Sequence, residues 1–153
     1  MNIYEYEVKK LEQVEIVLMD IGIKIENRLD LFSVLCTDAR CYELGIPRSS
    51  AKAVLGDSYL DSAMFAHCEK LIEFNYQLFT KERMNSLREQ VENPRLVDTM
   101  ERLLISEHVI GGNCELIVDK HLSTCFEAIV YVIHKYHGFE GINKFLEGIK
   151  FYN

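Results

Sequence analysis

The stretch Ser49–Phe74, SSAKAVLGDSYLDSAMFAHCEKLIEF, is expected to form the central helix of the fold. It contains no proline, and its apolar residues recur at helical spacing in one stripe along one face: Ala53, Leu60, Met64 and Leu71. Asp57 falls in this stripe, where a carboxylate is unfavourable unless a positive group meets it. Gly56, beside it, would let another backbone come close, although glycine costs a helix roughly 1 kcal/mol relative to alanine. This helix is therefore the first place to look for function.

The composition is that of an ordinary globular protein, and the 153 residues are expected to form a single domain over 1–153. Hydrophobic residues make up 48% and charged residues 27% of the chain, and no apolar run reaches the roughly 18 residues of a membrane helix. The five cysteines contain no CxxC pair, which favours reduced thiols and a cytoplasmic location, and no secretory signal is visible. The net charge of −7 argues against a dedicated basic nucleic-acid-binding domain, but not against an enzyme that meets a polyanion through metal ions.

Helical periodicity extends over the rest of the chain and predicts an all-α fold of about seven helices. Beside the central helix, the expected helices cover residues 6–21, 27–44, 80–91, 93–104, 119–136 and 139–152. Gly22, Gly45 and Gly138 lie at expected breaks, and Thr80 is expected to cap the helix that follows it. Residues 114–118 are either a short strand or merely extended chain.

Glu127 is a second carboxylate in an apolar setting, because it is the only ionised group among residues 125–133. It is therefore expected to be buried. Magnesium prefers a few carboxylates and several waters, so Asp57 and Glu127 would suffice as the nucleus of a site if their helices converged. Two metal ions held there could activate water and stabilise the leaving oxygen of a phosphodiester. The alternative is that each acid pairs with a lysine or arginine, or caps a helix, inside an ordinary bundle.

Four motifs in this order and spacing resemble those of the ribonuclease III family. LGDS at 55–58 resembles the end of the signature E-R-L-E-F-L-G-D, and FEAI at 126–129 resembles the second acidic motif, D-x-x-E-A-L-I-G. Between them, the family pattern R-x-x-V-x-N-x-x-L is similar to the group Leu87, Arg88, Val91, Asn93 and Leu96. Upstream, IGIKI at 21–25 followed by Leu29 and Leu31 resembles the leader L-G-Y-x-F. The resemblance covers nearly the whole chain.

The resemblance implies a ribonuclease III-like endonuclease domain that works as a homodimer built on the signature helix. It implies that Asp57 and Glu127 hold Mg²⁺, for which Mn²⁺ can substitute, and that this site generates the hydroxide that hydrolyses a phosphodiester. The substrate would be double-stranded or structured RNA, sensed through shape and backbone, and the products a 5′ phosphate and a 3′ hydroxyl.

The sequence also departs from the family pattern. Ser50 and Ala53 replace the two signature glutamates, and Thr124 replaces the leading aspartate of the second motif. The compact Mini-III relatives show a similar reduced pattern and lack a separate double-stranded-RNA-binding domain, for which this chain likewise has no room. They also carry an acid four residues after the aspartate, as Asp61 does here, so Asp61 is either a further group at the metal site or an exposed helical aspartate.

Two basic residues are candidate RNA contacts. Lys120 lies where the family tends to have a lysine before the second motif, with a solvated surface lysine as the alternative. Arg88 belongs to a basic group with Lys81, Arg83 and Arg95, which forms either a phosphate-contacting edge or a mixed solvated face. Two other functions stay open: a catalytically degenerate ribonuclease III fold that serves as a dimerisation or RNA-scaffold module, and an unrelated helical interaction domain.

Overall fold

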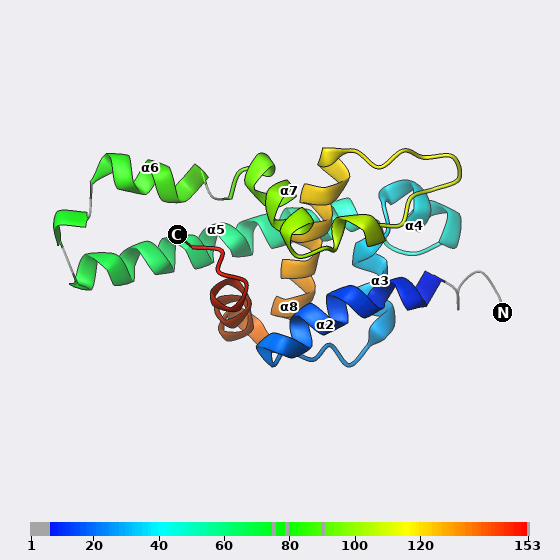
Figure 1. Cartoon of the computed structure of the whole chain (residues 1–153), viewed down its shortest axis with the longest axis horizontal. Helices are drawn as coiled ribbons and strands as arrows, with labels where there is room; N and C mark the ends of the chain where they lie inside the picture. Colours follow the sequence, from blue (N-terminus) through cyan, green and yellow to red (C-terminus); the bar gives the residue numbers. More distant parts are fainter. Residues whose placement is uncertain (1–6, 75, 79, 90, 153) are drawn as a thin grey trace.

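The computed structural model describes residues 7–74, 76–78, 80–89 and 91–152, except for the side chains of residues 72, 74 and 78. Within these residues it contains seven α-helices: α2 (Glu12–Ile21), α3 (Arg28–Leu35), α4 (Asp38–Leu44), α5 (Ser49–Phe74), α6 (Lys81–Glu89), α7 (Asn93–Arg102) and α8 (Asp119–Gly148) (Figure 1). Three short 3-10 turns complete it: η1 (Lys9–Leu11), η2 (Tyr76–Leu78) and η3 (Ser106–His108). The all-α prediction is confirmed, and segment 114–118 forms no strand.

The central helix has the predicted bounds, but the predicted helix 27–44 is wrong, because the structure divides it into α3 and α4. Asn27 caps α3 as predicted, accepting a hydrogen bond from the Leu29 N–H. The chain becomes extended at Cys36, and Thr37 caps α4. Backbone hydrogen bonds to a distant segment stabilise this break, because the Thr37 N–H donates to the Ile110 carbonyl and the Ile110 N–H donates to the Leu35 carbonyl.

Other helix ends follow the local chemistry of the sequence. The Thr80 hydroxyl accepts from the Arg83 N–H, so its predicted role as a cap is confirmed. Gly138 has a left-handed φ of 64°, and α8 changes direction there, which Figure 1 shows as two helical segments at an angle. The second segment ends at Gly148 and not at the predicted residue 152. The predicted start of the first helix, Tyr6, lies outside the described residues.

The core forms where α5 and the first segment of α8 cross (Figure 1). A Cβ atom on Gly56 would lie 1.7 Å from the carbonyl oxygen of Glu127, so the two backbones touch at this point. Ala53, Leu60 and Met64 are at most 5% exposed and Leu71 is partly buried, which confirms the predicted stripe. Toward the end of α5, Leu87 of α6 packs against Met64 and Cys68 in a second, smaller cluster.

Asp57 is exposed, so the prediction that it lies within the buried stripe is wrong. The reason is that α8 packs on the side of α5 that carries Gly56, which leaves Asp57, the next residue round the helix, at the edge of the contact. Within the described residues, no helix has the length and apolar character needed to cross a membrane.

Candidate active site

Asp57 and Glu127, hereafter the acidic pair, meet beside the crossing of α5 and α8. Gly56 precedes Asp57, and its contact with the Glu127 backbone brings the two helices as close as main chains can pack. The carboxyl groups of the acidic pair lie close enough for Asp57 to raise the pKa of Glu127, through a side-chain hydrogen bond and through its charge. The structure thus brings together the acids that two separate motifs supplied.

The environment of the acidic pair favours the protonated form of Glu127. Burial, the hydrogen bond that protonated Glu127 donates to Asp57, and the charges of Asp57 and Asp61 together raise the pKa of Glu127 from 4.5 to about 8. Glu127 was predicted to be buried, but the structure shows it only partly buried. The open edge at Asp57 leaves it accessible to solvent. Two like charges near each other in a partly apolar setting share a proton in preference to ionising together.

Asp61, one turn after Asp57, belongs to the same electrostatic environment. Burial and the charge of Asp57 raise the pKa of Asp61, while Arg88 of α6 acts in the opposite direction. Arg88 is exposed, and its effect on Asp61 indicates that its guanidinium lies on the acidic side of α5. Among the described residues, neither member of the acidic pair forms a salt bridge, so the alternative of two buried ion pairs is not what the structure contains.

The predicted contact Lys120 lies further toward the N-terminal ends of both helices. It is exposed and lines a hollow of about 230 Å³ together with Ser50 and Thr124. Two of the three positions where the family pattern has further acids therefore border one cavity, hereafter the polar hollow. The third, Ala53, is buried in the core stripe.

A network around the polar hollow was not expected from the sequence. The Thr37 hydroxyl and the Gly112 N–H both donate to Glu115, and the Thr37 bond is the main reason that the pKa of Glu115 is lowered. His121 Nε2 lies 3.6 Å from Glu115, while its Nδ1 accepts from the Val118 N–H at 3.0 Å. These residues come from separate loops and helix ends, so no spacing along the chain signals them.

The donor set of the acidic pair fits a divalent ion that keeps most of its water. Magnesium is commonly bound by one or two carboxylates and several waters, and the exposed side of Asp57 leaves room for them. No group of three or more His, Cys, Asp or Glu side chains is arranged to hold a metal among the described residues, so Asp61 does not complete a ligand set with the pair. Any role for Asp61 at such an ion would be through water.

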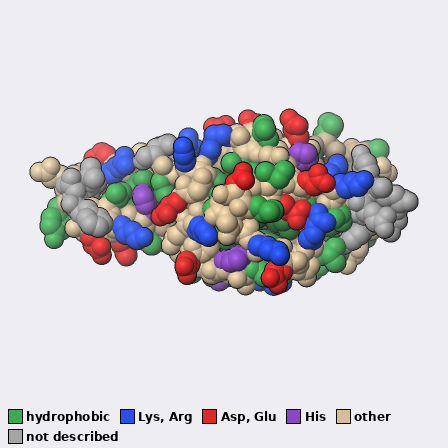
Figure 2. Space-filling model, turned by 60° about the horizontal axis from the view of Figure 1, so that its bottom comes forward, with side chains coloured by type: hydrophobic (Ala, Val, Ile, Leu, Met, Phe, Trp, Pro, Cys, Tyr) green, Lys and Arg blue, Asp and Glu red, His purple; other side chains and the backbone are tan. Residues whose placement is uncertain are grey.

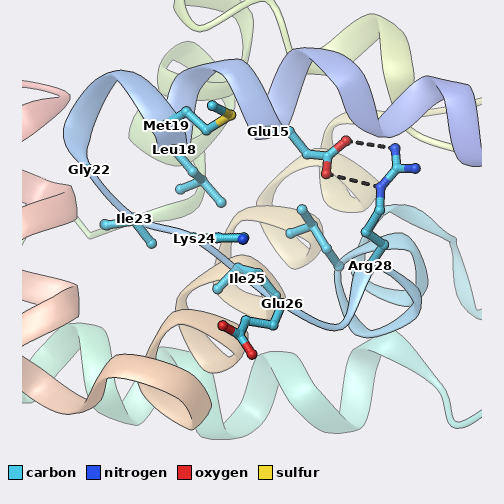
Figure 3. Close-up of a pocket in the computed structure, with 10 residues that line it drawn as sticks. Glu15, Leu18, Met19, Gly22, Ile23, Lys24, Ile25, Glu26 and Arg28 are labelled. Atoms are coloured by element: carbon cyan, nitrogen blue, oxygen red, sulfur yellow. Dashed lines mark hydrogen bonds and ion pairs between the residues drawn. The ribbon is translucent and has the colours of Figure 1, made fainter.

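The hollow of about 500 Å³ shown in Figure 3 lies elsewhere, between α2 and the loop that follows it. Its walls are mainly apolar and include Leu18, Ile23 and Leu31. Two of its charged side chains are engaged with each other, because Arg28 donates to both carboxylate oxygens of Glu15 at 2.7 and 3.0 Å. None of the residues predicted to act at the site lines it.

The crossing of α5 and α8 brings residues from three of the sequence motifs together. The LGDS and FEAI motifs contribute the acidic pair, and the third motif contributes Arg88 nearby. In comparisons with known proteins, no family model and no curated protein matches this chain.

Proposed function

We propose that this chain is a divalent-metal-dependent endoribonuclease that hydrolyses phosphodiesters in double-stranded or structured RNA. The observation that carries the proposal is the convergence of Asp57 and Glu127, with no salt bridge to either among the described residues. Repulsion and desolvation make such a pair unfavourable by itself, and a bound cation relieves both. The resemblance to the ribonuclease III family, in motifs that contain these acids, supplies the reaction and the substrate class.

Each residue of the site has a distinct part in this proposal. Mg²⁺ or Mn²⁺, when bound, would polarise a phosphoryl oxygen and activate a water molecule. Asp57 and Glu127 would hold the ion, and Glu127 must release its proton to do so. Asp61 would orient a water molecule. Arg88 and Lys120 would contact RNA phosphates on either side of the acidic pair.

The α5 surface that faces away from the core supports the proposed homodimer. Val54, Leu55 and Phe65 are 69%, 47% and 55% exposed, and they share this surface with the small residues Ala51, Ser58 and Ser62. Large apolar side chains among small ones at helical spacing are suited to close packing against a second helix. Of the other residues on which the dimer was predicted, Leu71 is partly buried and the Ile72 side chain lies outside the described residues.

The exposed basic residues favour weak, salt-sensitive RNA binding. Figure 2 shows lysine and arginine side chains interspersed with aspartate and glutamate on one face of the molecule, without a continuous basic stripe. With a net charge of −7, the chain offers only local attraction to a polyanion. Metal ions at the acidic pair would reduce repulsion of the RNA.

The deciding experiment incubates the purified chain with long duplex RNA in Mg²⁺, in Mn²⁺ and in EDTA. We expect cleavage with either metal and none in EDTA. Asp57→Asn and Glu127→Gln keep the side-chain shapes and should each lower the rate at least about 100-fold. The exposed acids Asp20 and Glu101 provide matched controls, since Asp20→Asn and Glu101→Gln make the same changes away from the acidic pair. Equal cleavage by all four variants would refute the assignment.

The second candidate function is a ribonuclease III fold that binds RNA or dimerises without cleaving. The lack of a three-ligand group among the described residues favours it, as do Ser50, Ala53 and Thr124 at positions of family acids. This function predicts RNA binding that magnesium does not strengthen, and intact RNA in every metal. Binding and cleavage measured on the same samples separate the two.

A further inference from the structure

The opposite flank of α5 carries a hollow of about 470 Å³ that the proposed RNA site does not use. Its lining comes from α3, α5, α8 and the loop before α5. The apolar part of this lining consists of Leu29, Ile46, Pro47, Leu55 and Tyr131. Its charged groups are Arg48, Lys52, Lys135 and Asp30, so we call this cavity the basic hollow. Three cations and one acid give it a positive balance on a chain with net charge −7.

Lys52 is the recessed cation of the basic hollow. It is partly buried, and its ammonium donates a 2.5 Å hydrogen bond to the Ser33 hydroxyl, which is itself buried. Ser33 in turn donates to the Asp30 carbonyl oxygen at 2.8 Å, which orients its hydroxyl oxygen toward Lys52. Burial lowers the pKa of Lys52, against the attraction of Asp30. No salt bridge neutralises this ammonium within the described residues.

The acid that lines the hollow, Asp30, already has hydrogen-bond partners within the protein. Asp30 accepts from Lys135 at 2.7 Å and from the Tyr136 hydroxyl. Burial by itself would raise the pKa of Asp30, but these two hydrogen bonds outweigh it and lower the pKa. The Arg48 side chain is exposed at the rim and forms no salt bridge within the described part of the chain. Lys52 and Arg48 therefore remain as two positive charges that a dianion would balance.

We propose that the basic hollow binds a small phosphate monoester carried on an apolar or aromatic body. The phosphate would contact Arg48 at the rim, under the attraction of the Lys52 charge, and the body would extend toward Lys52 against Leu29, Ile46 and Tyr131. A mainly apolar cavity with a few convergent polar groups is typical of small-molecule sites. An RNA backbone is the less suitable occupant, because a cation recessed between apolar walls is out of reach of a wide duplex. This inference does not depend on the proposed ribonuclease activity.

Pyridoxal 5′-phosphate and inorganic phosphate are suitable probes. The aldehyde of the first condenses with an unprotonated lysine amine, forming an imine and releasing water, and borohydride then donates a hydride that reduces the imine to a stable secondary amine. Mass spectrometry of peptides locates the label. We expect Lys52 to be labelled at least about tenfold faster than the exposed Lys9 and Lys81, with excess inorganic phosphate removing most of this advantage. Pyridoxal, which lacks the phosphate, should label Lys52 more slowly.

Two variants complete the test. Arg48→Gln changes an exposed residue, so the fold should hold while the advantage of the phosphate-bearing probe over pyridoxal falls at least about threefold. Lys70→Gln, an exposed lysine outside the hollow, is the control and should leave the labelling of Lys52 unchanged. Labelling spread evenly over exposed lysines, no competition by phosphate, or an unchanged preference in Arg48→Gln would each overturn the proposal. RNA cleavage measured on the same variants tests the other proposal independently.

Discussion

The two flanks of α5 carry opposite charges, with Asp57 on the acidic flank and Lys52 on the basic flank, and these charges are balanced to different degrees. On the acidic flank, Asp57 meets Glu127 with no paired cation among the described residues, and the pKa of Glu127 rises to about 8. On the basic flank, one internal acid, Asp30, already neutralises Lys135 and weakens the repulsion between the cations. Both flanks depend on the crossing at Gly56. The comparison indicates that the acidic flank is the more dependent on pH and on a bound counter-ion.

The largest effect should come from Gly56→Ala, which removes the structure that both flanks share. A methyl group there would lie 1.7 Å from a backbone oxygen, so the helices must separate. We expect the free energy of unfolding to fall by at least about 3 kcal/mol, against the gain of about 1 kcal/mol that this change gives an exposed helix. Chemical denaturation measures it. Ser62→Ala on the exposed surface of α5 is the control and should stay within about 0.5 kcal/mol. A stabilised Gly56→Ala would contradict the close crossing.

Glu127→Gln should make the protein more stable at pH 8 than its parent in EDTA. The folded pKa of Glu127 is about 8 and its ordinary value 4.5, so between these values the folded state binds more protons and stability falls as pH rises. The contribution is fully present below pH 4.5 and is lost as pH rises through 8. Allowing for solvent screening of a half-exposed group, we expect roughly 1–3 kcal/mol between pH 5 and 8.5. The amide keeps the neutral shape and should remove this slope.

The quantity to measure is the difference in free energy of unfolding between the parent and Glu127→Gln at each pH, because other groups also titrate. Burial lowers the pKa of His67, so its contribution in the same window rises with pH and opposes that of Glu127. Magnesium should restore the parent's stability most strongly at high pH, since the ion replaces the shared proton, and should not stabilise Glu127→Gln. Loss of stability in the amide variant, with no magnesium effect in the parent, would instead indicate a buried ion pair.

The exposed surface of α5 lies between the two flanks, and Phe65→Glu tests whether a second copy covers it. Sedimentation of the parent at micromolar concentration should give twice the chain mass of 17.8 kDa. A carboxylate in an apolar interface should weaken the dimer at least about tenfold, and RNA affinity should fall with it. Leu116→Glu is the control, because Leu116 is more exposed than Phe65 and lies outside α5. A monomeric parent would leave each acidic pair with only one wall of the RNA cleft.

Local patterns in the sequence predicted the elements of the crossing well. Apolar spacing found the buried stripe through Ala53 and Leu60, and the conformational freedom of glycine located the close approach at Gly56 and the bend at Gly138. These features are determined within a few turns of one helix. The predictions went wrong where distant segments decide the outcome. Periodicity gives the direction of Asp57 on its helix, but the placement of α8 determines that Asp57 is exposed.

The division of residues 27–44 has a similar explanation. The apolar pattern continues through Leu35 and Cys36 without a glycine or proline, and the break depends on backbone hydrogen bonds with Ile110. The hydrogen bonds of Glu115 with Thr37 and the basic hollow around Lys52 likewise join several separate segments. A single sequence contains no spacing that reports such contacts. The two members of the acidic pair were predicted from the apolar setting of each acid and from the motifs that contain them.

The smallest effect concerns Arg88, the basic residue next to the acidic flank. If it contacts one RNA phosphate, Arg88→Gln should lower affinity a few-fold and reduce the slope of log affinity against log salt by about one. Lys9→Gln is the charge-matched control at the other end of the molecule, where η1 lies far from α6 (Figure 1). RNA binding measured by fluorescence anisotropy over a salt series, with and without Mg²⁺, distinguishes the effect of Arg88→Gln from that of Lys9→Gln. In the parent, Mg²⁺ should strengthen binding because it neutralises the acids that repel RNA. Tight binding that ignores salt, magnesium and Arg88 would place the RNA away from this flank, and the acidic pair would then lose its proposed substrate.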